Sequence, residues 1–69
     1  MFIFYQVEWW VPEDRGAVYR KDFQDKVHAS RIVAKLEADS KVKKITITKI
    51  SARIENGEIL WNRKIIEEI

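Results

Sequence analysis

Few side chains of this 69-residue sequence could do chemistry, and they are scattered along the chain. His28 is the single histidine and cysteine is absent, so a zinc site would have to combine His28 with carboxylates, which is a weak ligand set. Ser30 lies two residues from His28, but nothing around it resembles the glycine-rich turn that presents a serine nucleophile. His28 is more simply interpreted as a polar residue on a helix surface.

The remaining reactive groups are carboxylates and glycines in turn-like or terminal positions. Acidic pairs occur at Glu13-Asp14 and at Glu67-Glu68, where solvated charges are the simpler interpretation. Both glycines fit turns, which leaves no glycine-rich loop to hold a phosphate. Because catalysis needs reactive groups that converge, we expect a non-enzyme that uses neither a cofactor nor a metal.

The composition predicts one folded domain covering residues 1–69. Apolar residues make up 46% of the chain, and three Trp, two Tyr and three Phe provide enough large side chains for a single core. The net charge of +2 is too small to indicate a nucleic-acid partner by itself. The chain lacks cysteine, and its apolar runs fall far short of the roughly 20 residues that span a membrane, so we expect a soluble cytoplasmic protein.

Two strands are predicted in the first third of the chain. Residues 2–11 alternate in polarity with period two, and Pro12 ends the run. Residues 17–23 also alternate, and Gly16 allows a tight turn before them, which favours a second strand paired with the first. The alternative is that residues 17–23 already begin the following helix.

A helix is predicted from about residue 25 to residue 38, because the apolar spacing changes there to a helical period. Its apolar stripe consists of Ala29, Ile32, Val33 and Leu36. Asp25, or alternatively Asp22, is a suitable N-terminal cap, since its carboxylate can accept a hydrogen bond from a free backbone amide.

Residues 42–66 predict a β-hairpin with a two-residue turn at Asn56-Gly57, the strongest short hairpin signal. That turn fixes the register and so sorts the side chains into two faces. One face collects Ile50, Ala52, Ile54, Ile59, Trp61 and Ile65. The other collects Lys49, Ser51, Arg53, Leu60, Asn62 and Lys64.

The apolar pattern of the third strand changes phase along its length. Ile45 and Ile47 occupy odd positions, whereas Ile50, Ala52 and Ile54 occupy even ones. A β-bulge near Thr48-Lys49 would bring both groups to one face, and we expect such a bulge. The alternative is a strand that buries both of its faces at one end.

These elements assemble into an α+β domain of order β-β-α-β-β, or β-α-β-β if residues 17–23 are helical. One helix then packs on one face of a small antiparallel sheet. The helix stripe is expected to meet Ile3, Tyr5, Val7, Trp9, Ile54, Ile59 and Trp61. The opposite face is expected to display Phe2, Phe4, Trp10, Lys49, Arg53, Leu60 and Lys64.

Exposed aromatic residues beside cations predict a binding surface, because a monomer seldom leaves such a patch in water. We expect a small protein-binding module, an accessory or inhibitor protein of the kind that phages encode, or a chain that self-associates. The candidate contacts are Phe4, Trp10, Lys49, Arg53, Leu60 and Lys64. The alternative is binding of single-stranded nucleic acid, with bases stacked on the aromatic rings. A third interpretation is that the aromatic residues pack beneath the terminus and the lysines solubilise a sheet edge.

Overall fold

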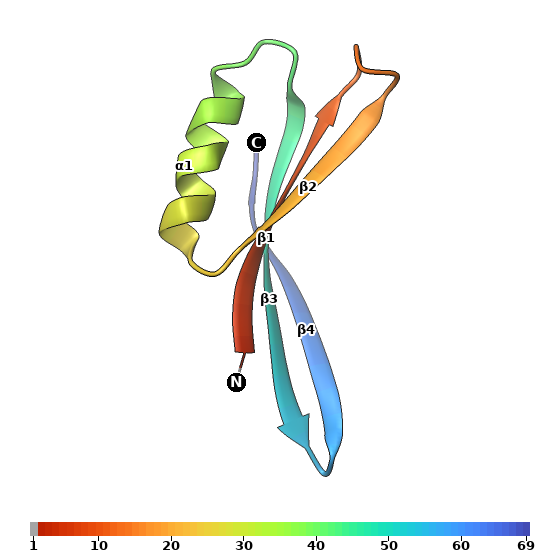
Figure 1. Ribbon diagram of the computed structural model, residues 1–69, viewed down its shortest axis with the longest axis vertical. Helices are drawn as coiled ribbons and strands as arrows, with labels where there is room; N and C mark the ends of the chain where they lie inside the picture. Colours follow the sequence, from red (N-terminus) through yellow and green to blue (C-terminus); the bar gives the residue numbers. More distant parts are fainter. Residues whose placement is uncertain (1) are drawn as a thin grey trace.

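The computed structural model describes residues 2–69, which form a twisted four-stranded antiparallel sheet with one helix (Figure 1). The elements in chain order are β1 (Phe2–Val11), β2 (Ala17–Phe23), α1 (Lys26–Glu37), β3 (Lys43–Glu55) and β4 (Glu58–Glu68). The strands lie in the order β2-β1-β3-β4. The predicted α+β class and the order β-β-α-β-β are confirmed, and residues 17–23 form a strand.

Both hairpin turns use backbone conformations in the left-handed region. Asn56 and Gly57 have φ of 52° and 76°, as the predicted two-residue turn requires. The predicted register of this hairpin is confirmed from the Glu55–Glu58 pair to the Lys49–Lys64 pair. The local signal in the Asn-Gly dipeptide therefore positions the side chains of residues 49–64 relative to their cross-strand neighbours.

The helix begins immediately after Asp25, which is confirmed as its N-terminal cap. The Asp25 carboxylate accepts a hydrogen bond from the backbone amide of His28 at 2.9 Å, and Nδ1 of His28 lies 2.7 Å from the same carboxylate. Ala29 and Val33 of the predicted stripe are buried against the sheet. Among residues 2–69, no helix has the length and apolar character needed to cross a membrane.

The core lies between α1 and one end of the sheet. Val7, Ile45 and Ile47 of the central strands are buried against Ala29 and Val33 of the helix. The partly buried residues around them are Tyr5, Trp9, Phe23, Ile32, Leu36, Val42 and Ile66. The expected contact of the helix with Tyr5, Val7 and Trp9 is therefore confirmed.

The expected bulge in β3 near Thr48-Lys49 is wrong. Pairing between β1 and β3 is continuous from Phe2–Ala52 to Trp9–Ile45, so the side chains of β3 keep alternating through this segment. As a result, Ile47 faces the helix and Ile50 faces the other way, and both are buried. The structure thus adopts the alternative, a strand that buries both faces.

The irregular positions of the sheet lie elsewhere. Lys44 is an extra residue of β3 opposite the Trp9–Trp10 step, and its φ is 52°. Ile66 is an extra residue of β4 opposite the Ile47–Thr48 step, and it packs against the core. The bulge that brings a late apolar residue to the core therefore belongs to β4.

The molecule is elongated because β3 and β4 continue past the end of β1. The first residue of β1, Phe2, pairs with Ala52, so within residues 2–69 the segment 53–60 is a two-stranded extension, which we call the ribbon. Figure 1 shows the ribbon running away from α1 to one end of the molecule. The radius of gyration is 13.9 Å, whereas a compact chain of this length has about 11 Å.

Candidate functional site

The sheet has two unlike faces, which we name the helix face and the distal face. The helix face carries Tyr5, Val7 and Trp9 of β1, and α1 covers them. The distal face carries the alternate residues of β1 and the residues that pair with them in the other strands. Across residues 2–69, all secondary structure outside the sheet lies in α1, so the distal face is uncovered.

The ribbon end of the distal face is apolar and exposed. Its four large side chains, which we call the apolar patch, are Phe2, Ile54, Ile59 and Trp61. They expose 59%, 79%, 59% and 61% of their surface, respectively. With Ala52 and Arg53 they line a shallow depression of about 600 Å³. Individual exposed apolar residues are ordinary, but here four large ones lie side by side and form one contiguous apolar area.

A small layer of packed side chains supports the apolar patch. Ile50 lies opposite Phe4 of β1, and Ala52 lies opposite Phe2 of β1 and Trp61 of β4. Ile50 and Ala52 are buried, and the Phe2 and Phe4 rings lie 5.6 Å apart at a tilt of 52°. The patch is therefore held in shape at its base, while the ribbon carries Ile54 and Ile59 beyond it.

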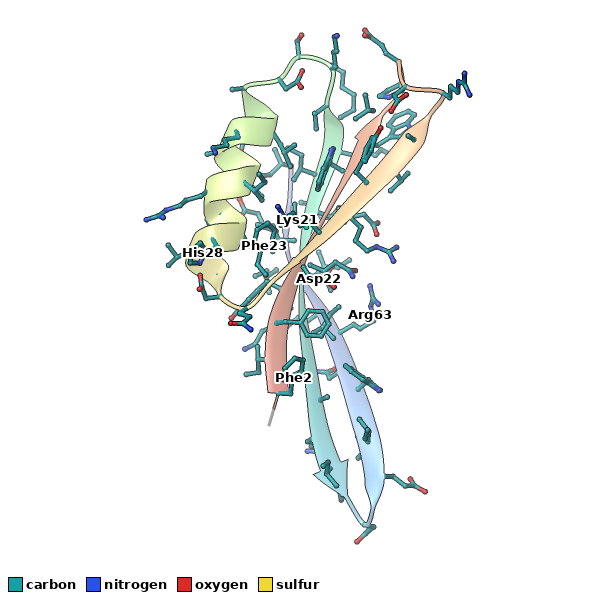
Figure 2. The ribbon with its side chains drawn as sticks, viewed as in Figure 1. Phe2, Lys21, Asp22, Phe23, His28 and Arg63 are labelled. Atoms are coloured by element: carbon teal, nitrogen blue, oxygen red, sulfur yellow. The ribbon has the colours of Figure 1, made fainter. Side chains whose placement is uncertain are left out.

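A belt of polar contacts crosses the distal face beside the patch. The Gln6 side chain, which is only 8% exposed, donates a hydrogen bond to Asp22 of β2 at 3.1 Å. Its carbonyl oxygen accepts one from Arg63 of β4 at 3.3 Å. Figure 2 shows Asp22 and Arg63 near the middle of the molecule, with Phe2 farther toward the ribbon. This polar belt ties both edge strands to β1.

The charges at the belt are matched in sign. Arg20 of β2 forms an ion pair with Glu8 of β1 at 2.9 Å, next to the contacts of Asp22 and Arg63 with Gln6. These four charged side chains are two acids and two bases, so this part of the distal face carries no net formal charge. The part of the distal face around the belt is therefore polar but close to neutral.

The structure divides the six predicted contact residues between the two faces. Phe4 and Trp10 lie on the distal face as expected, with Trp10 at the end far from the ribbon, where Lys44 Nζ is 5.9 Å from its ring. The other four, which are Lys49, Arg53, Leu60 and Lys64, lie on the helix face. The expectation that all six share one surface is wrong.

This correction follows from the register of β3. Lys49 pairs with Tyr5 of β1 on the one side and Lys64 of β4 on the other, and residues that pair directly share a face. Arg53 and Leu60 form another pair in the same phase, and Arg53 binds Glu55 at 3.2 Å. Lys49 and Lys64 are therefore on the opposite side of the sheet from the exposed aromatic rings. Arg53 has the same phase but also borders the depression at the apolar patch, and Arg63 of the hairpin lies on the distal face.

The residues that sequence reasoning missed are Ile54, Ile59 and Trp61. They were expected beneath the helix, and this is wrong, because the uninterrupted alternation of β3 turns them to the distal face. The sequence does contain a signal for this arrangement, because Ile45 occupies an odd position of the strand and Ile54 an even one. It predicts two apolar faces if the strand is continuous and one apolar face if a bulge intervenes.

The titratable groups with shifted pKa values serve local structure. Hydrogen bonds from the backbone and ring of His28 lower the pKa of Asp25 at the helix cap. The Tyr19 hydroxyl donates to the Asp14 carboxylate, and this bond raises the pKa of Tyr19 near the first turn. In the part of the chain that the structure describes, no three side chains of His, Asp or Glu converge as a metal site would need.

Comparisons of the chain with protein-family models, curated proteins and solved structures give no match.

Proposed function

We propose that this protein is a small non-catalytic protein-binding module whose contact surface is the apolar patch. The observation that carries the proposal is the exposure of Phe2, Ile54, Ile59 and Trp61 together on one face of an ordered sheet. A chain of this size fits an accessory or inhibitory role, acting by occupying a partner's surface. We place the module in the cytoplasm, since a cysteine-free chain of this size suits a reducing compartment.

The energetics of the patch favour a protein partner. Each large apolar side chain that becomes buried contributes about 1.5–3 kcal/mol, so four of them can drive a specific association. Trp61 is the expected centre, because tryptophan is enriched among the residues that dominate interface energies. The polar belt with Asp22 and Arg63 then provides the polar rim that borders such contacts.

Binding of single-stranded nucleic acid is less well supported. Such binding needs cations beside the stacking rings to meet the phosphates. Here Lys49, Arg53 and Lys64 belong to the phase of the helix face, so they do not share a face with Phe4 and Trp10 as expected. Lys44 does lie 5.9 Å from the Trp10 ring, and Arg63 is on the distal face, where it donates to Gln6. The distal face also pairs its own charges near the belt. The placement of the three expected cations and this pairing favour a protein partner.

Paired variants of neighbouring residues test the proposal. Ile59 and Leu60 are adjacent in β4 but point to opposite faces, so Ile59→Lys places a charge in the apolar patch and Leu60→Lys places the same charge on the other side. Tagged wild type and both variants are passed through a lysate of the source cells, with and without nuclease. Circular dichroism checks that each variant is folded.

We expect a protein to be retained after nuclease treatment by the wild type and by Leu60→Lys, and to be reduced at least tenfold on Ile59→Lys. Retention that is equal for both folded variants would contradict the assignment of the surface. Loss of all bound material on nuclease treatment would instead support the nucleic-acid alternative.

A further inference from the structure

The accessible surface of the molecule is large for its mass. It measures 5367 Å², whereas a globular monomer of 8.3 kDa exposes about 4,600 Å². The excess of about 800 Å² equals the area that each partner contributes to an interface of standard size. The elongated shape thus exposes extra surface on the scale of one standard protein contact.

The ribbon is the part of the sheet with the least support from other strands. A two-stranded hairpin is at best marginally stable in water, and the segment 53–60 has only its own two strands among the described residues. A cover that binds only occasionally would leave Ile54 and Ile59 in water most of the time. A second copy of the chain is available wherever the chain itself is made.

The distal face is electrically compatible with a copy of itself. A two-fold symmetric contact joins the same surface of both partners, so a surface that carried charges of one sign would repel its copy. Arg53, which borders the depression at the apolar patch, binds Glu55 at 3.2 Å, and Arg63 and Asp22 of the belt both bind Gln6, so each of these bases is matched by an acid. The like-charged pair of Lys49 and Lys64 lies on the helix face, outside such a contact.

We infer that the occupant of the apolar patch is a second copy of this chain, packed face to face in a two-fold symmetric dimer. This inference rests on the proposed function, because it names the partner of the same surface. With the symmetry axis near Trp61, the ribbon tip of each copy lies over the layer formed by Phe2 and Phe4 of the other. The two sheets pack about 10 Å apart, as in a β-sandwich.

Sedimentation equilibrium of the untagged protein over a wide concentration range tests this inference. We expect wild type and Leu60→Lys to sediment at twice the mass of the chain. Ile59→Lys is expected to raise the dissociation constant of the dimer by roughly a hundredfold or more, because the dimer contains the changed residue twice. Ile54→Lys is a second test variant at the exposed tip, where a substitution does not disturb the core.

The outcomes separate this inference from the proposed function. A wild type that is monomeric at every concentration would overturn the inference that the partner is a second copy. Capture of another protein that depends on Ile59 would still support the proposed binding module. A dimer that both Ile59→Lys and Ile54→Lys leave intact would overturn the placement of the contact. If Ile59→Lys does not fold, Ile54→Lys decides the result.

Discussion

Asp25 shows how one exposed carboxylate links backbone geometry to the pH dependence of stability. It accepts hydrogen bonds from the His28 backbone amide and from the His28 ring, and both bonds lower its pKa in the folded state. A depressed folded pKa means that the ionised carboxylate stabilises the fold. That contribution is complete above the pKa of the unfolded chain and is lost as the pH falls through the folded value.

Substitution of Asp25 therefore has two separable effects. Asp25→Ala removes the cap and should lower Tm by about 4–8 °C at neutral pH. Asp25→Asn keeps a capping side chain and should retain most of the stability at neutral pH. Because the amide does not titrate, acid should destabilise this variant less than it destabilises the wild type. Thermal unfolding from neutral pH to about pH 3 measures both. An unchanged acid dependence in the Asn variant would contradict this account.

At the scale of elements, some features of β3 follow from local sequence signals, and others follow from its pairing with β1. The helix cap at Asp25 and the turn at Asn56-Gly57 are local, so the sequence predicts them and the hairpin register correctly. The face on which Ile54 lies depends on whether β3 runs without interruption alongside β1. That is a property of two segments far apart in the chain, and the residues around Thr48 do not encode it.

The two faces of β3 predict different effects on stability when an isoleucine is replaced by alanine. Ile47 is 1% exposed in the core, whereas Ile54 is 79% exposed on the ribbon. Ile47→Ala should lower the free energy of unfolding by about 2–5 kcal/mol, because it leaves a cavity. Ile54→Ala should change it by less than about 0.5 kcal/mol at concentrations where the chain is monomeric. Urea unfolding compares the two, and similar losses would contradict the assigned faces.

At the scale of the whole molecule, stability is graded along an axis 46 Å long. The core around Val7 and Ile47 lies at the end covered by α1, and the ribbon extends from the other end. Local opening costs least where few apolar contacts are broken. The ribbon is therefore the part of the sheet that we expect to open most easily.

Hydrogen exchange followed residue by residue should reproduce this gradient. In dilute solution, the paired amides of segment 53–60 should exchange fastest among the strand amides, and those of Val7 and Ile47 slowest. If a second copy covers the apolar patch, protection of the ribbon should rise with protein concentration while protection of the core does not. Uniform protection along β3 in dilute solution would contradict a graded molecule.

The uninterrupted pairing of β3 with β1 also has an evolutionary consequence. Side chains alternate with period two, so insertion of a single codon between Thr48 and Ile50 would rotate the rest of β3 by one face. The Asn56-Gly57 turn would carry β4 with it, and Ile54, Ile59 and Trp61 would move to the helix side together. One insertion or deletion event could thus move these apolar side chains from one face of the sheet to the other, with no change in the identity of any of them.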